Sequence, residues 1–257
     1  MWSIDPIGVL LPLALSITYA GLLAVRREAW PGWRTVCWFG GVVVLAWCLL
    51  GAPAARRAET PWWGALGIAL VAAVVPLGLA LGNPIGLWEN GRRPIAWVRG
   101  RPARVVMFPL VASAVSAAVL TIAFTGGWYA AARRHDGAWT LLVLAALAVG
   151  LLVNLPLLSE DLLPAWCGPG LRTVLAFLDG LLDAIPGIVV MTTVERFTGG
   201  ALLAVAESVG VPMIFAVLAQ WVRADEREAR ATDARLDAAE AEGDFDGTPW
   251  WRSAERR

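Results

Sequence analysis

Seven stretches of this sequence are apolar and long enough to cross the roughly 30 Å hydrocarbon core of a bilayer as helices. A chain that is 58% hydrophobic and 16% charged, with a mean hydropathy of +0.63, is typical of a polytopic membrane protein. We therefore expect an all-α fold, a bundle of seven transmembrane helices embedded in lipid. The stretches lie at about residues 5 to 25, 34 to 51, 62 to 82, 105 to 126, 138 to 158, 171 to 191 and 199 to 222.

The arginines predict the orientation of the bundle. The loops "RREAWPGWR" and "NPIGLWENGRRPIAWVRGRPAR" and the segment "RADEREAR" alternate to one side, and the other side carries fewer arginines. The positive-inside rule then places the N-terminus outside and the C-terminus in the cytoplasm, in a multi-pass protein of the cytoplasmic membrane. The first stretch has no basic n-region and no cleavage site, so it reads as a retained span.

Two domains are expected. Residues 1–222 would form the seven-helix transmembrane domain, and residues 223–257 a charged cytoplasmic tail. The segment "RADEREARATDARLDAAEAE" interleaves opposite charges, which is typical of a solvated helix. The end, "GDFDGTPWWRSAERR", is predicted to be disordered.

The composition excludes several classes of protein. All 21 basic residues are arginine, so no lysine is present for a retinal Schiff base. His135 is the only histidine, which excludes a haem held between two histidines. It lies in the connector "RRHDG", where a solvated surface histidine is favoured, so no Ser/His/Asp or Cys/His set can be assembled. We therefore predict no enzyme. The net charge of zero gives no sign of a nucleic-acid partner, and the oligomeric state stays open.

Three acids fall inside the apolar stretches. Asp179 and Asp183 are spaced i, i+4, which places both on one face of a helix, and Glu207 lies at a comparable depth in the next stretch. An ionised carboxylate near the bilayer centre costs about 2.5 to 3.5 kcal/mol, and no arginine lies well inside any stretch to pair with it. Protonation, hydrogen bonding or a bound cation must compensate for that cost.

Prolines accompany these acids. Pro76, Pro186 and Pro212 are expected to kink their helices, because proline lacks the N–H that would bond to the carbonyl four residues earlier. The carbonyls freed by Pro186 and Pro212 belong to Leu182 and Ser208, each next to an acid. Asp179, Asp183 and Glu207 could therefore form an oxygen-rich site for a proton or a hard cation.

A structural interpretation of the acids carries more weight. Neutral carboxyl groups in helix bundles often form hydrogen bonds to neighbouring helices and serve only to hold them together. The candidate partners are Asn154, Ser208, Thr18 and Tyr19.

Four stretches, taken in order, resemble the CtaG-type cytochrome c oxidase assembly family. They are "VVPLGLALGNPIGL", "AFTGGWYAAARRH", "GLLVNLPLLSEDLLPAWCGPGLRTVLAFLDGLLDAIPGIVVM" and "WVRADEREARATDARLDA". The resemblance implies a seven-helix protein that delivers copper to a haem-copper terminal oxidase, or otherwise helps it mature. An oxidase subunit would then be its partner.

This sequence departs from that family where metal binding would be expected. The paired histidines of the family's third span correspond to Gly64 and Ile68, and histidine is also replaced in "AWTLLVLAAL" and near Asp183. Asp179 and Gly187 are retained. Copper prefers imidazole or sulfur ligands, so we predict no metal site and assign no cofactor. Bound copper remains a minor alternative. The remaining soft ligands are Met107, Met191, Met213 and the three cysteines.

Two hypotheses for the function follow. The first is a membrane-embedded assembly factor for a haem-copper oxidase, acting in copper delivery or as a scaffold. The alternative is a transporter that handles protons or cations with Asp179, Asp183 and Glu207.

Overall fold

The fold is known from a computed structural model, which describes residues 6–25, 29–89, 108–158 and 169–241. All regular structure in these ranges is helical, as the sequence predicts. In chain order the helices are α1 (Pro6–Val25), α2 (Gly32–Leu50), α3 (Ala52–Arg56), α4 (Pro61–Ala72), α5 (Val74–Leu81), α6 (Pro84–Glu89), α8 (Pro109–Thr125), α9 (Trp128–Arg134), α10 (Asp136–Leu158), α11 (Pro169–Thr193) and α12 (Arg196–Ala241).

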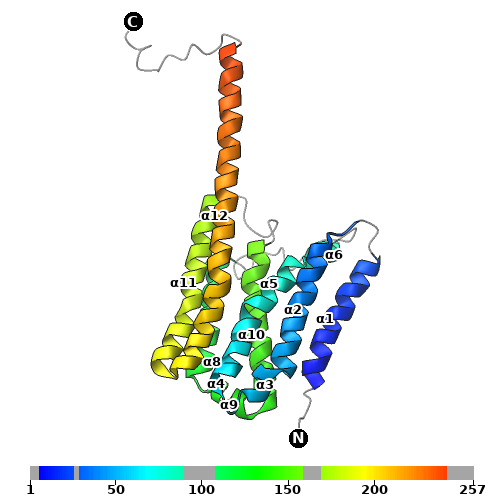
Figure 1. Ribbon diagram of the computed structural model, residues 1–257, viewed down its shortest axis with the longest axis vertical. Helices are drawn as coiled ribbons and strands as arrows, with labels where there is room; N and C mark the ends of the chain where they lie inside the picture. Colours follow the sequence, from blue (N-terminus) through cyan, green and yellow to red (C-terminus); the bar gives the residue numbers. More distant parts are fainter. Residues whose placement is uncertain (1–5, 26–28, 90–107, 159–168, 242–257) are drawn as a thin grey trace.

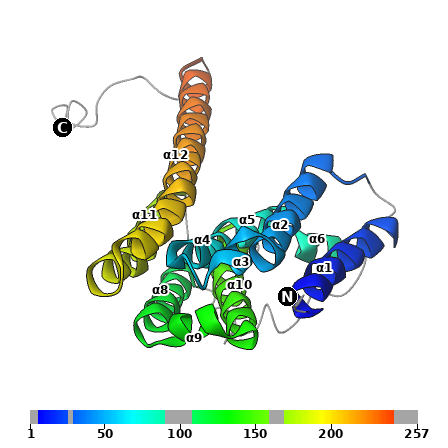
Figure 2. The same ribbon diagram turned by 60° about the horizontal axis from the view of Figure 1, so that its bottom comes forward.

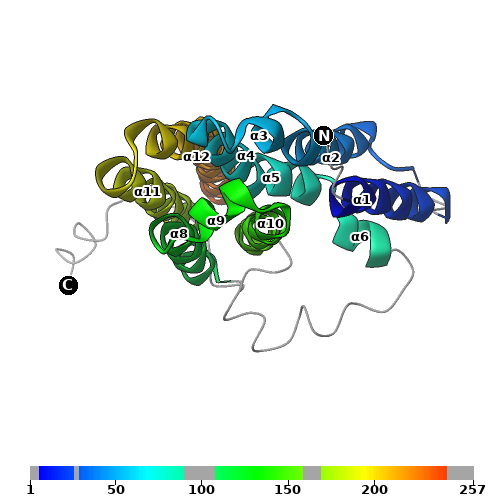
Figure 3. The same cartoon turned by 90° about the horizontal axis from the view of Figure 1, so that it is seen from below.

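The long helices run roughly along one common direction (Figure 1). Seen from below, α11 and α12 lie at one edge, α1 and α6 lie at the other, and α4, α5 and α10 fill the middle (Figure 3). The central helices supply the most deeply buried side chains, including Ile68 on α4 and Leu142 on α10. The apolar core therefore lies between α4, α5 and α10, and apolar side chains also cover the outside of the bundle.

The described residues contain five helical segments that are long and apolar enough to cross a membrane. The pair α8 and α9 raises the number to six if it counts as one bent span. The polytopic helical architecture is thereby confirmed. The number of seven spans stays a prediction, because the seventh predicted stretch lies in α12, which is not among these segments.

Two breaks interrupt the helices where the sequence contains proline or glycine. Ala73 separates α4 from α5, and Pro76, one turn later, has no N–H to offer the carbonyl of Ala72. Helices α8 and α9 meet at an angle of 62°. Gly127 precedes α9 with a φ of 86°, which a residue with a Cβ rarely adopts. By contrast, α11 and α12 continue through Pro186 and Pro212.

The last helix is much longer than the bundle is tall. Over its first half α12 packs beside α11, and its second half projects well past the other helices (Figures 1 and 2). The projecting part contains the charged segment after Arg223 and is helical as far as Ala241. The predicted disordered end, residues 242–257, lies outside the described residues.

The two ends of the bundle differ in the segments they carry. α1 begins at the same end as the turns around α3 and α9, and α12 projects from the opposite end (Figure 1). The start of α1 and the projecting part of α12 therefore lie at opposite ends of the bundle. Which side is cytoplasmic stays a prediction from the arginine distribution.

Candidate functional site

A small internal cavity lies between α4, α8, α10, α11 and α12. Its volume is about 50 Å³, which would hold roughly three or four water molecules. Most of its lining is small or aliphatic. The polar side chains that line it are Ser116, Asn154, Asp179 and Asp183.

Asp179 is the more buried of the two aspartates and contacts another helix. The side chain is 8% exposed, and the hydroxyl of Ser113 on α8 donates a hydrogen bond to its carboxyl group. The same hydroxyl oxygen also lies 2.7 Å from the carbonyl oxygen of Pro109, a second acceptor. This hydroxyl therefore bridges the backbone of α8 and the carboxyl group on α11.

Asp183 lies one turn further along α11 and is half-buried in the same cavity. Pro186 lines the cavity beside it, and the carbonyl of Leu182 therefore lacks its helical N–H partner. Ala72, whose carbonyl is freed by Pro76 in the same way, is also a lining residue. The cavity thus combines two carboxyl groups with two backbone segments whose carbonyls lack helical partners.

Glycines permit the close packing around this cavity. A Cβ added to Gly150 on α10 would lie 2.1 Å from the carbonyl oxygen of Ala72, so α10 touches the break between α4 and α5 there. On α12, a Cβ at Gly199 would lie 2.2 Å from the backbone nitrogen of Met191. At Gly187 the nearest backbone atom, the nitrogen of Leu203, would be 2.9 Å away. Small residues at these positions bring the helix backbones together, as is usual in membrane bundles.

Glu207 does not join the two aspartates. It occupies an exposed position on α12, whereas its neighbours Ala206 and Gly210 line the cavity. The structure therefore brings together two of the three predicted site residues. The candidate site is the cavity that contains Asp179 and Asp183.

The hydrogen-bond partner of Asp179 differs from the candidates suggested by the sequence. Asn154 lines the cavity but donates to the carbonyl of Gly150 at 2.9 Å. The hydroxyl of Tyr19 donates to the carbonyl of Gly82 at 3.0 Å, near the opposite edge of the bundle. Ser113 was missed because it lies 66 residues away in the chain. The sequence offered one signal for a polar contact here: Ser113 and Ser116 are three residues apart in a mostly apolar stretch and therefore lie on one helix face.

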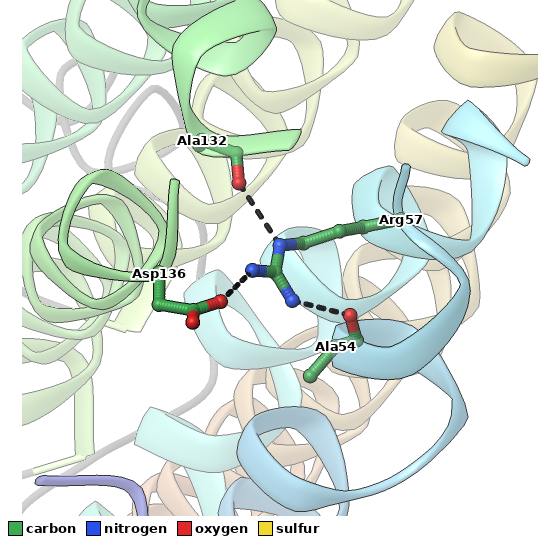
Figure 4. Close-up of polar contacts among 4 residues, drawn as sticks. All are labelled: Ala54, Arg57, Ala132 and Asp136. Carbon is green, nitrogen blue, oxygen red and sulfur yellow. Dashed lines mark hydrogen bonds and ion pairs between the residues drawn. The ribbon is translucent and has the colours of Figure 1, made fainter. Parts of the chain in front are cut away.

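A second polar cluster, not predicted from the sequence, surrounds Arg57 at the α3 and α9 end of the bundle (Figure 4). The guanidinium donates hydrogen bonds to the carbonyls of Ala54 and Ala132 and forms an ion pair with Asp136. It also lies 5.3 Å from the centre of the Trp139 ring. These contacts join the segment after α3 to the ends of α9 and α10, so the cluster has a structural role.

The described residues contain no group of three or more His, Cys, Asp or Glu side chains that could hold a metal ion. Gly64 and Ile68, which replace the expected histidines, are both buried. A Cβ at Gly64 would lie 2.6 Å from the hydroxyl oxygen of Tyr129, so the position has no room for a ligand side chain as packed here. The donors around the cavity are oxygens, which suit a proton, water or a hard cation better than copper.

The fold and the cavity define a polytopic helical membrane protein with paired carboxyl groups buried between its helices. Residues 18–224 match the family described as cytochrome c oxidase caa3 assembly factor (Caa3_CtaG), and the chain belongs to this family. The match covers the helices from α1 to the point where α12 leaves the bundle. Comparisons with curated proteins and with solved structures gave no match.

Proposed function

We propose that this protein is a non-enzymatic assembly factor for a haem-copper terminal oxidase of the cytoplasmic membrane, and that it acts as a scaffold. The observation that carries the proposal is the family match over residues 18–224, which includes nearly the whole bundle. A scaffold needs helices that contact an oxidase subunit, and it needs no ligand set of its own.

The ligand chemistry favours a scaffold over copper delivery. Copper in a membrane protein is held by imidazole or sulfur. The cysteines of α2, Cys37 and Cys48, are free, and eleven residues of helix separate them by about 16 Å, too far to share one ion. Gly64 and Ile68 offer no donor atoms at all.

Deletion of the gene tests the assembly role. We expect membranes of the deletion strain to lose most of the haem-copper oxidase signal in reduced-minus-oxidised spectra, together with most of the oxidase activity. Expression of the intact chain from a plasmid should restore both, which controls for effects on neighbouring genes. A normal oxidase spectrum in the deletion strain would rule out the assembly role.

The cavity supports a second candidate function, the handling of protons or cations. Asp179 and Asp183 share one small cavity with Ala72 and Pro186, and intramembrane carboxyl groups of this kind mark ion pathways in many transporters. This function would involve Asp179 and Asp183 but not Glu207, which does not line the cavity.

Flux measurements on proteoliposomes separate this candidate from the assembly role. A transporter should move protons or monovalent cations when the wild-type chain is reconstituted, and the double variant Asp179→Asn, Asp183→Asn should not. Equal flux for wild type, double variant and empty vesicles would reject transport and would leave the assembly role intact.

A further inference from the structure

An exposed strip runs along the membrane part of α12 and faces away from the cavity. Ala206, Val209 and Gly210 of this helix line the cavity. The residues on the other side form the exposed strip, and they are Glu207, Ser208, Val211, Pro212 and Phe215. Their spacing of three and four residues places them on one helix face.

The seventh predicted span, residues 199 to 222, would place the strip deep in the hydrocarbon layer. Glu207 is eleven residues after Arg196, the first residue of α12, which is about 16 Å along the helix axis. The hydrocarbon core is roughly 30 Å thick, so this carboxyl group lies near its middle. A carboxyl group that faces lipid at this depth is strongly unfavourable.

With Glu207 ionised, the strip presents two hydrogen-bond acceptors and no available donor. Pro212 has no N–H, so the carbonyl of Ser208 lacks its helical partner. The hydroxyl of Ser208 donates to the carbonyl of Ala204 at 2.6 Å and is therefore committed within the helix. Within the described part of the chain, neither a hydrogen bond nor an ion pair joins Glu207 to another residue.

No side chain in the described part of the chain supplies the missing donor. The sequence contains no lysine, and the arginines of the described helices lie at or near the ends of the predicted spans. A second copy would bring another carboxyl group to the strip, and the two could pair only by sharing a proton. A basic side chain on a different protein pairs with an ionised Glu207 directly, so we favour that partner.

We propose that the strip formed by Glu207, Ser208, Val211, Pro212 and Phe215 is a docking face for a transmembrane helix of another membrane protein, and that this helix presents a basic or other donor side chain near mid-membrane. Val211 and Phe215 supply the apolar contact, and Glu207 with the Ser208 carbonyl accepts the donor. The inference goes beyond the assembly role, because the partner need not be an oxidase subunit.

Site-specific photo-cross-linking in native membranes tests the docking face. The full chain carries a benzophenone amino acid at Phe215, which is 65% exposed on the strip, and the cross-linked peptides are identified by mass spectrometry. A matched control carries it at Ile122, which is 66% exposed on α8. We expect an adduct from position 215, absent from position 122, within a membrane-spanning helix that has a donor side chain within one turn of the cross-link.

Substitutions then test the chemistry of the contact. Glu207→Leu makes the strip more apolar and leaves the packing of the bundle unchanged, yet it should lower the adduct yield about tenfold, since an interhelical hydrogen bond is lost. Glu207→Gln keeps an acceptor and should keep most of the yield. Replacement of the partner's donor by alanine should lower the yield as much as Glu207→Leu does.

Four results would overturn the proposal: adducts between two copies of the chain, adducts with lipid alone, a partner helix without a donor, or a yield that Glu207→Leu leaves unchanged. Variant abundance in the membrane is measured in parallel, so that a loss of adduct is compared at equal protein. The oxidase spectrum of the deletion strain is independent of these results, and each proposal can fail without the other.

Discussion

At the residue scale, the hydrogen bond between Ser113 and Asp179 decides how a carboxyl group is tolerated inside the bundle. The sequence predicted that Asp179 and Asp183 share a helix face, because that follows from helical periodicity alone. It could not identify Ser113, because the contact depends on how α8 packs against α11. The prediction for Glu207 was incomplete for the same reason. Its place along the helix follows from counting residues, but the side of α12 that it occupies depends on which face of α12 packs on α11 and α4.

Ser113→Ala should destabilise the folded protein by about 1 kcal/mol, because the buried carboxyl group loses its partner on α8. In an Asp179→Ala background the same change should cost much less, since no acceptor remains. Thermal or denaturant unfolding in detergent measures both. Thr125→Ala is the control, because that exposed hydroxyl bonds to its own helix. Equal costs of Ser113→Ala in the two backgrounds would show that the contact contributes nothing.

At the element scale, proline and glycine explain most of what could be foreseen. The break between α4 and α5 and the bend between α8 and α9 fall where "VVP" and "TGG" interrupt apolar stretches. The charged segment predicts a helical extension after the seventh apolar stretch, and α12 runs without a break from Arg196 to Ala241. The sequence did not foresee the Arg57 cluster, which joins residues more than 70 positions apart.

Gly199→Ala should separate α11 from α12, since the new Cβ would lie 2.2 Å from the backbone nitrogen of Met191. We expect a loss of about 1 to 3 kcal/mol in the free energy of unfolding. The neighbouring Gly200→Ala is the matched control, because nothing lies within 4 Å of its added Cβ. Unfolding in detergent compares the two variants. Similar stability for both would contradict the close crossing at Gly199.

At the scale of the whole molecule, the turn before α10 and the projecting part of α12 lie at opposite ends of the bundle (Figure 1). The family match and the helical architecture agree with the prediction from the sequence. Hydropathy identified the membrane stretches because the lipid environment constrains them so strongly. It gave no information on which helices touch, and the cavity depends on those contacts.

Single cysteines at Arg134 and Thr232, introduced after replacement of the three native cysteines, test the orientation. A membrane-impermeant thiol reagent should label position 134 in intact cells and position 232 only after the cells are opened. Both positions are exposed in the structure, so accessibility within the protein does not limit labelling. The reverse pattern would invert the orientation, and labelling of both positions in intact cells would remove the predicted separation.

We propose that the protein supports oxidase assembly as a scaffold and does not deliver copper. The most direct measurement is the reduced-minus-oxidised haem spectrum of membranes from the deletion strain grown with added copper. A scaffold cannot be replaced by its client's metal, so the oxidase signal should stay low at every copper concentration and return only with the gene. Recovery of the signal by copper alone would contradict the claim and would identify the protein as a copper carrier.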